Sequence, residues 1–337
     1  MSMILIYHFL YHGTTPTPTD HVIYGLPIPH NAMLFCGVNL FILISGYYGM
    51  KFTWKSVVKL ALLVWFFVLL NIILIYAFGG ALPPTTLLNR LLSSFLLPLS
   101  NQYWFISIYF ILMATVPILN PGLKRMTIRQ LRIMVILLTF ITIYSCGLGG
   151  NSASNGGYDY PLFLYLYVCG YYIHKEPLFK NAKNYVFLIA FFAIGILDFI
   201  LAYFEYRFFG KIFLEGNYNH PFVLFAAFAL FIYFSNISIH SKVINRIAAC
   251  ALGCYMLQDG IFGNVILYPI LRESLSVDPT FISVVRIVFA FILIWICSFF
   301  FTNLANLWIP KTTDWLCHKF SHINSWMSEL SEDLKKQ

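Results

Sequence analysis

The sequence predicts an all-α, polytopic membrane protein, a helix bundle of about ten transmembrane helices. Hydrophobic residues make up 60% of its 337 residues and charged residues only 10%, whereas charged residues form roughly a quarter of a soluble domain. Apolar stretches long enough for a membrane helix recur along the chain. The 34 Phe and 22 Tyr fit lipid-facing surfaces and interfacial aromatic belts.

The apolar stretches divide the chain into ten expected spans, because a helix needs about 20 residues to cross the hydrocarbon core. The sixth is short at its core but extends through Tyr158 and Tyr160 on one side and Ile173 on the other. We expect the spans at residues 1–11, 31–49, 56–78, 102–119, 131–148, 161–174, 184–204, 219–235, 246–270 and 281–307.

The first span, residues 1–11, is too short to cross a membrane alone, since a helix of that length extends only about 16 Å. It has neither a charged leading segment nor a cleavage site, which argues against a signal peptide. We therefore expect the first helix to be truncated, with its start lying upstream of Met1.

The tail from Lys311 onward repeats apolar residues at alternating steps of four and three, which indicates an amphipathic helix. These residues are Leu316, Phe320, Ile323, Met327, Leu330 and Leu334. Such a helix either lies on the inner membrane surface or contacts a second copy in a homodimer. The predicted domains are a transmembrane domain at 1–310 and a cytoplasmic tail helix at 311–337.

The net charge of +8 follows membrane topology rather than nucleic-acid binding, because the basic residues are spread thinly between apolar segments instead of gathering on one face. With a cytoplasmic amino terminus, all but five of the 21 lysines and arginines fall on the cytoplasmic side, as the positive-inside rule requires. The five exceptions are Arg90, Arg207, Lys211, Arg272 and Arg286. Both termini are therefore expected in the cytoplasm.

No metal site is predicted from the seven cysteines. Cys250 and Cys254 lie one helical turn apart, but they lack nearby histidines and a second pair of ligands. They are interpreted as packing residues. A nucleophile elbow, a phosphate loop and a zinc-binding His-Glu-x-x-His pair are also absent from the sequence.

Four ionisable residues fall within spans, where such groups are costly and therefore mark candidate sites. His8 is either a general base or a structural histidine bonded to a backbone carbonyl. Asp198 either pairs across the bundle or stays protonated. Asp259 occupies a helix interrupted by glycines at 260 and 263, where irregular backbone can line a cavity. Arg286 is interpreted as snorkelling to an interface.

Three segments together resemble the acyltransferase-3 family of multi-pass membrane enzymes, which includes bacterial O-acetyltransferases of surface polysaccharides. The first is Ile6-Tyr7-His8-Phe9, followed after a loop by Ser45-Gly46-Tyr47. The second is Gln102-Tyr103-Trp104-Phe105. The third runs from Leu252 to Asp259. The resemblance covers nearly the whole chain and implies a ten-helix bundle in a bacterial inner membrane.

The resemblance also implies the reaction: transfer of an acyl group, usually acetyl, from acetyl-CoA or another acyl-CoA to a hydroxyl of a surface polysaccharide or lipid-linked sugar. His8 matches the family histidine and would be the catalytic base. Lys55 and Lys59 would meet coenzyme A phosphates, although positive-inside lysines explain them equally well. The expected substrate-binding residues are Ser45, Tyr47, Tyr103, Trp104, Tyr255, Gln258 and Asp259.

Two features depart from the family pattern. An arginine eleven positions before the histidine would fall upstream of Met1, and Gln258 stands where the family has a late histidine. Because an amide does not transfer protons at neutral pH, substrate positioning is expected of Gln258. Two alternatives are a transporter or glycan flippase that uses Asp198 and Asp259 as relay groups, and a catalytically dead membrane scaffold.

Overall fold

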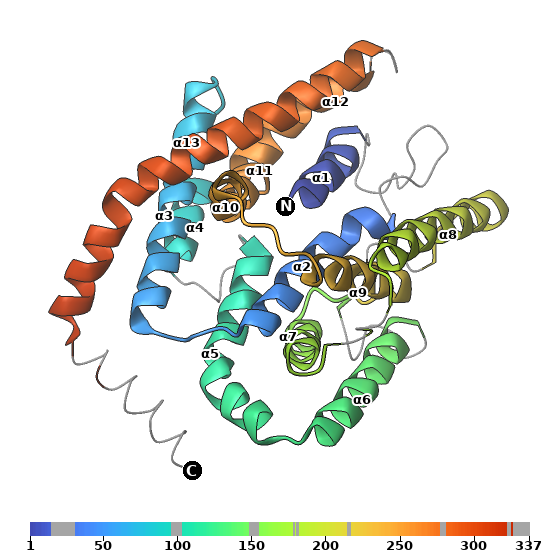
Figure 1. The fold of residues 1–337 in the computed structure, drawn as a ribbon. Coiled ribbons are helices and arrows are strands. Elements are labelled where there is room, and N and C mark those ends of the chain that lie inside the picture. Colours follow the sequence, from blue (N-terminus) through green and yellow to red (C-terminus); the bar gives the residue numbers. More distant parts are fainter. Residues whose placement is uncertain are drawn as a thin grey trace. The chain divides into compact units, whose positions relative to one another are not determined.

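The computed structural model describes residues 1–14, 31–95, 103–147, 155–177, 179, 182–213, 217–276, 281–321 and 325. Within these residues the regular structure is helical throughout, which confirms the predicted all-α class. Figure 1 labels the helices in chain order. The chain divides into two compact units, one formed by Met1–Pro18, Lys51–Phe110 and Ser241–Gln337, the other by Thr19–Met50 and Ile111–His240.

The first unit gathers helices from both ends of the chain. Its helix α3 packs against α4, α11 and α13, while α1 packs mainly on α12. Helix α3 begins after Thr53, whose Oγ1 accepts a hydrogen bond from the N–H of Ser56 as an N-cap. The helices are α1 (Ser2–Thr14), α3 (Trp54–Ala77), α4 (Pro84–Phe95), α10 (Lys242–Ala249), α11 (Ala251–Gln258), the π-helical η4 (Gly263–Leu267), α12 (Tyr268–Ser276) and α13 (Phe281–Lys319), with the start of α5 (Trp104–Arg125).

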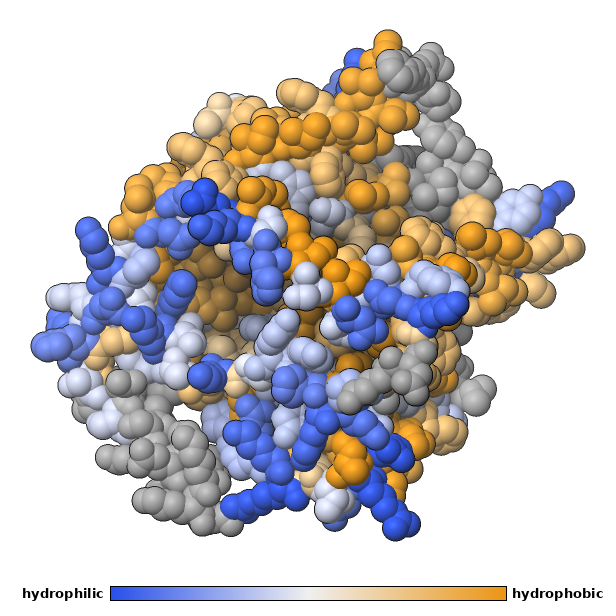
Figure 2. Space-filling view, viewed as in Figure 1, coloured by the Kyte–Doolittle hydropathy of each residue, from blue (hydrophilic) through white to orange (hydrophobic). Residues whose placement is uncertain are grey.

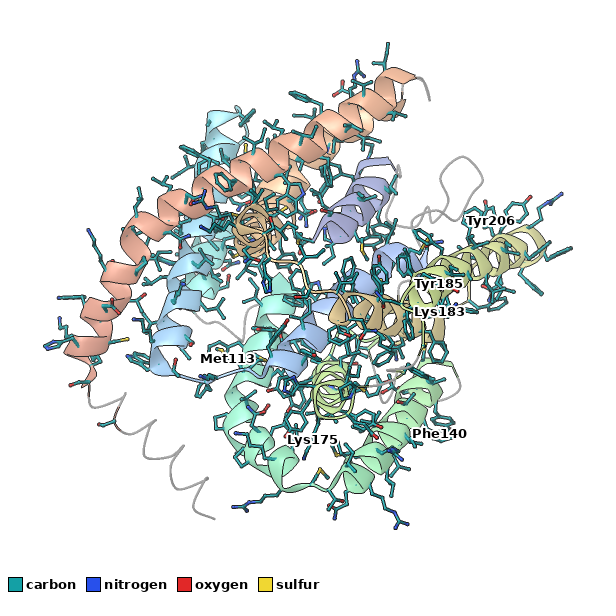
Figure 3. The ribbon with its side chains drawn as sticks, in the orientation of Figure 1. Met113, Phe140, Lys175, Lys183, Tyr185 and Tyr206 are labelled. Atoms are coloured by element: carbon teal, nitrogen blue, oxygen red, sulfur yellow. The ribbon has the colours of Figure 1, made fainter. Side chains whose placement is uncertain are left out.

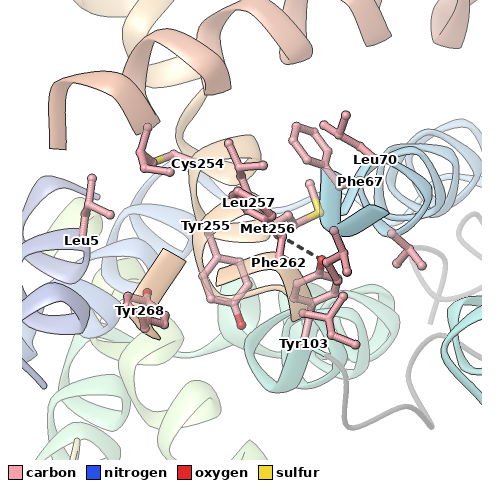
Figure 4. Close-up of a cluster of buried hydrophobic side chains, with 14 of the residues drawn as sticks. Leu5, Phe67, Leu70, Tyr103, Cys254, Tyr255, Met256, Leu257, Phe262 and Tyr268 are labelled. Atoms are coloured by element: carbon pink, nitrogen blue, oxygen red, sulfur yellow. Dashed lines mark hydrogen bonds between the residues drawn. The ribbon is translucent and has the colours of Figure 1, made fainter. Parts of the chain in front are cut away.

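The core of this unit surrounds α11. Figure 4 shows Leu5 of α1, Phe67 of α3 and Tyr103 grouped with the side chains of α11. Gly253 of α11 lets neighbouring helices come close, because a Cβ there would lie 2.3 Å from Thr302 Oγ1 and 2.8 Å from Phe67 Cζ. Small residues at contacts between membrane helices have this effect, so α11 is tightly held.

The second unit is built around α2. This helix contacts α7, α8 and α9, while α6 packs on α7 and α8 on α9. Asp159 caps α7 by accepting from the N–H of Leu162, and Pro221 begins α9, where its missing N–H costs nothing. The helices are α2 (Ala32–Tyr48), α6 (Ile128–Gly147), α7 (Tyr160–Lys175), α8 (Tyr185–Phe209) and α9 (Pro221–Ser235), with the end of α5.

Two glycines determine how closely α2 approaches α7. A Cβ at Gly46 would lie 2.1 Å from the carbonyl oxygen of Tyr167, and a Cβ at Gly170 would lie 2.2 Å from that of Leu43. Each helix therefore presents its glycine to the backbone of the other. No side chain fits at either position without moving a helix, as in other small-residue crossings of membrane helices.

Asp198 of α8 lies at the start of α2. Its Oδ2 accepts a hydrogen bond of 2.8 Å from the N–H of Ala32, and its Oδ1 lies 3.9 Å from His220 Nδ1. Asn31 Nδ2 adds a bond of 2.9 Å to the carbonyl oxygen of Gly195. An acid at a helix N-terminus satisfies a free backbone N–H. Asp198 thus pairs across the bundle, which is one of the two alternatives drawn from the sequence.

Several helices have the length and composition of membrane spans. In the described part of the chain, five pass both requirements: Trp54–Ala77, Trp104–Arg125, Ile128–Cys146, Tyr185–Phe209 and Val284–Lys319. Counting the bent pair Lys242–Gln258 and Gly263–Glu273 as one span makes six, and Ala32–Tyr48 and Pro221–Ser235 are shorter apolar helices. The protein is a polytopic helical membrane protein, as predicted. The number ten stays a prediction.

Helix α8 displays the features of a spanning helix. Figure 3 shows Tyr185 and Tyr206 near its two ends and Lys183 just before its start. These tyrosines are separated by about 31 Å along a helix rising about 1.5 Å per residue, which matches a hydrocarbon core of about 30 Å. Hydrophobic residues cover α8 and much of α13 in the space-filling view (Figure 2). The two tyrosines therefore have the spacing expected of residues in interfacial aromatic belts.

Helix α13 continues through Pro310 to Lys319, so the expected domain boundary between residues 310 and 311 falls inside one helix. Most of the expected tail helix lies outside the described residues, which end at residue 321 apart from residue 325. The division into two domains and the contact with a second copy stay predictions.

Candidate functional site

The candidate site begins at a break between α11 and η4, where the chain bends by 61°. Two glycines make the break sterically possible. A Cβ at Gly263 would lie 1.8 Å from the carbonyl oxygen of Gln258, and a Cβ at Gly260 would lie 2.3 Å from Asn71 Oδ1. The interrupted helix that the sequence predicts at 260–263 is therefore present, and Gln258 and Asp259 stand at its edge.

The backbone groups freed by the break are satisfied by two side chains. The Met256 carbonyl accepts a bond of 3.0 Å from Tyr103 Oη and one of 3.2 Å from Asn71 Nδ2. Asn71 Oδ1 accepts from the N–H of Phe262 at 3.1 Å. Buried backbone groups without partners are costly in a membrane. Asn71 and Tyr103 therefore stabilise the bent conformation, and the dashed line in Figure 4 marks the Tyr103 bond.

His8 faces this break from α1. Its side chain is buried, and its Nδ1 is hydrogen-bonded to Gln258 Oε1 at 2.8 Å. The same oxygen accepts a bond of 2.5 Å from Tyr268 Oη. Gln258 is completely buried, and its Nε2 has no acceptor among the described residues. His8 is thus held by a side chain, and its role as a general base stays a prediction.

Further charged and titratable groups surround His8. Asp259 Oδ1 lies 3.8 Å from His8 Nδ1, which is beyond hydrogen-bonding distance but close enough to stabilise a positive imidazolium. The His12 ring lies 5.4 Å from the His8 ring and 5.1 Å from that of Tyr268. Arg272 Nη2 donates to the His12 carbonyl at 2.9 Å, joining α12 to the end of α1.

The first unit brings together several of the residues expected to form the site. His8, Tyr255, Gln258 and Asp259 lie around the break, and Tyr103 braces it. The rings of Tyr103 and Tyr255 are 5.9 Å apart. Trp104 starts α5 in this unit, with its ring 6.1 Å from that of Phe105.

The other expected site residues lie elsewhere. Lys55 and Lys59 are on the first turns of α3, and Lys55 Nζ forms an exposed ion pair of 2.6 Å with Asp314 of α13. Ser45 and Tyr47 belong to the second unit. There, Ser45 Oγ donates to the Phe41 carbonyl, and the Tyr47 ring contacts those of His174 and Phe231.

Sequence reasoning missed Tyr268 and Asn71, and it counted Arg272 only as an outer charge. Tyr268 lies ten residues after Gln258, beyond a bend that no periodicity reveals. The sequence does contain a signal for Asn71, because an amide in the middle of an apolar span needs hydrogen-bond partners. Among the described residues, no group of three His, Cys, Asp or Glu residues could hold a metal ion.

The comparisons with known proteins give one match. A family model, Acyl_transf_3, described as an acyltransferase domain, matches residues 1–316. No curated protein and no solved structure matches the chain.

Proposed function

Because this chain belongs to the acyltransferase-3 family and is a membrane acyltransferase, we propose that it transfers an acetyl group from acetyl-CoA to a hydroxyl of a surface polysaccharide or lipid-linked sugar. The observation that carries the proposal is His8, buried at a broken helix and held through its Nδ1 by Gln258. A positioned imidazole is the usual general base for activating a hydroxyl.

The reaction needs one proton acceptor that becomes a proton donor. His8 takes the proton of the acceptor hydroxyl as its oxygen attacks the thioester carbonyl. When the carbon–sulfur bond of the tetrahedral intermediate breaks, the imidazolium returns that proton to the leaving sulfur. The products are an ester and free coenzyme A, with no net proton change. A buried site also limits hydrolysis of the thioester, since water is largely excluded.

Asp259 supports this cycle electrostatically. During the reaction His8 is briefly positive, and the Asp259 carboxyl group lies 3.8 Å from its Nδ1. An opposite charge at that distance favours the protonated imidazole, and the effect is larger in a buried site than in water.

The donor is proposed to approach from the cytoplasm, where acyl-CoA is made. Lys55 and Lys59 lie one turn apart on α3, and two ammonium groups at that spacing suit coenzyme A phosphates as point charges. The ion pair between Lys55 and Asp314 is exposed to solvent, so Lys55 can leave it to bind a phosphate at little cost in free energy. The sugar is proposed to contact Tyr255, Trp104 and the Tyr103 ring, because aromatic faces bury the apolar side of a pyranose.

The test is acyl transfer by purified protein in lipid vesicles. Radiolabelled acetyl-CoA and a glycan extract from the host are supplied, and both free coenzyme A and labelled glycan are measured. His8→Ala should abolish both products, whereas His240→Ala, the same change at an exposed position, should retain them. Labelled glycan formed at the wild-type rate by His8→Ala would refute the role of His8. No transfer by folded wild-type protein to any carbohydrate fraction would refute the acceptor class.

A further inference from the structure

We infer that Gln258, held in place by Tyr268, is a positioning residue that keeps the proton of neutral His8 on Nδ1 and so makes Nε2 the atom that accepts the substrate proton. The inference rests on the proposed function and deepens it, because it assigns the chemistry to one nitrogen. It also gives a role to the amide that replaces a histidine of the family pattern.

The argument begins with what an amide oxygen can do. It has lone pairs and no hydrogen, so a group bonded to it must be the donor. His8 Nδ1 lies 2.8 Å from Gln258 Oε1, and Nδ1 therefore carries the hydrogen. A neutral imidazole has only one N–H. Its Nε2 must then present a lone pair, which is the state required of a general base.

Tyr268 determines which end of the amide faces His8. A phenol readily donates, and Tyr268 Oη lies 2.5 Å from the same Oε1 atom. In the rotated amide, Tyr268 Oη would have to accept from Nε2, and its own proton would lose its acceptor among the described residues. Gln258 is 0% exposed and Tyr268 is 1% exposed, so water does not compete for these bonds. Tyr268 and His8 therefore both donate to the Oε1 atom of Gln258, in a fixed geometry.

The other charged and titratable groups near His8 do not replace Gln258 in this role. Asp259 Oδ1 is 3.8 Å from Nδ1, too far to accept its proton in a hydrogen bond. Arg272 donates to the His12 carbonyl, and His12 contacts the His8 ring edge to face at 5.4 Å. Gln258 is the group among these that lies within hydrogen-bonding distance of His8 Nδ1.

The direct test is nuclear magnetic resonance of protein with isotope-labelled histidine ring nitrogens. The protein has nine histidines, so a difference spectrum against His8→Asn identifies the two signals of His8. At a pH where His8 is neutral, we expect the proton on Nδ1 and an unprotonated Nε2 in the wild-type protein. A proton on Nε2 would overturn the inference, because Gln258 would then be the donor.

Kinetics of two Gln258 variants give a second test. Gln258→Met has a similar length, but its sulfur accepts the hydrogen bond from Nδ1 only weakly; kcat should fall about 10- to 100-fold while KM for acyl-CoA changes less than about twofold. Gln258→Glu keeps the acceptor, so kcat should stay within about tenfold of wild type. Its carboxylate should also shift the acid limb of the pH–rate profile to higher pH. Equal losses in the two variants would contradict an acceptor role.

The two proposals can fail separately. If the resonance shows the Nδ1 proton but His8→Ala still transfers acyl groups, the tautomer assignment stands and the catalytic role of His8 fails. If His8→Ala is inactive but the wild-type proton lies on Nε2, the acyltransfer proposal stands and the role of Gln258 fails. If Gln258→Met does not fold, the wild-type spectrum is the deciding measurement.

Discussion

At the residue scale, the site depends on a few polar side chains that each satisfy more than one group. Asn71 bonds the carbonyls of Phe67 and Met256 and the N–H of Phe262. Gln258 similarly accepts from both His8 and Tyr268. Such connected buried groups fix one geometry, because losing one member leaves others without partners. The broken helix and the histidine facing it are thus stabilised by neighbouring bonds.

We predict that Asn71→Leu destabilises the protein. Leucine is branched at the same carbon atom but leaves the N–H of Phe262 without its acceptor, which should cost about 1–3 kcal/mol. Thermal unfolding of detergent-solubilised protein measures the effect. Asn303→Leu is the matched control, since Asn303 is exposed and, within the described part of the chain, donates to the carbonyl four residues earlier. Equal melting temperatures for wild type and Asn71→Leu would show that the bend does not need this amide.

Glu176 gives a prediction about pH. Tyr172 Oη donates to its Oε2 and Arg132 Nη2 to its Oε1, both at 2.7 Å, and these bonds hold the pKa of Glu176 below its ordinary value of 4.5. A carboxyl group with a lowered folded pKa stabilises the fold above the unfolded pKa, and this stabilisation is lost as pH falls through the folded pKa.

The melting temperature of wild type should therefore exceed that of Glu176→Gln near pH 7, and the difference should shrink as the pH falls below about 4.5. Glu205→Gln, measured over the same range, controls for general charge effects. A wild-type advantage that persists unchanged at pH 3 would contradict a contribution from the ionised carboxylate.

At the element scale, helix packing depends on glycines where two backbones approach. Gly46 and Gly170 lie where α2 crosses α7. Between membrane helices, contacts stabilise mainly through close van der Waals packing, since lipid is as apolar as the side chains it replaces. Around the same crossing, Tyr167 Oη donates to Asn120 Oδ1 and accepts from the N–H of Met50, so the end of α2 is also tied by polar bonds.

Gly46→Ala and Gly170→Ala should each destabilise the second unit by at least about 1–3 kcal/mol, because the new methyl group would overlap a carbonyl oxygen. Gly122→Ala in α5 is the control, since a Cβ there would meet no atom of another described element within 4 Å; it should be neutral or slightly stabilising. Unfolding in a denaturing detergent titration measures the three variants. A Gly46→Ala protein as stable as Gly122→Ala would contradict the close crossing.

At the whole-molecule scale, the candidate site needs both ends of the chain. His8 and Gln258 are 250 residues apart in sequence, and the entire second unit is inserted between segments of the first. The bonds at the site therefore form only when the first and the late helices have packed. Contacts at such separation are expected to form late, because the loop-closure entropy must be overcome first.

Topology gives a prediction for the whole chain. The positive-inside distribution places Lys183, before α8, in the cytoplasm and Arg207, near the end of α8, outside. In a background with the seven native cysteines replaced by serine, a membrane-impermeant maleimide should label Arg207→Cys on intact spheroplasts. Lys183→Cys should be labelled only after lysis. The reverse pattern would invert the proposed orientation and place both termini outside.

The sequence by itself determined the class of protein, the family and the broken late helix. Hydropathy and the scarcity of charge are enough to define membrane spans, and the glycines at 260 and 263 mark a break visible without coordinates. Motifs along nearly the whole chain were sufficient for the family, which the match over residues 1–316 confirms. The assignment of His8 as the catalytic base stays a prediction, drawn from an ionisable residue in an apolar helix and from the resemblance to the family.

Only the tertiary structure decided what surrounds His8. The sequence predicts substrate positioning for Gln258, but its bond to His8 depends on the packing of α1 beside the late helices. The partners of Tyr268 and Asn71 could not be assigned, since they lie beyond a bend or 185 residues away. Periodicity reports which face of a helix is apolar, but hydrogen-bond partners depend on how helices meet. The separation of two residues along the chain does not predict whether their helices pack together.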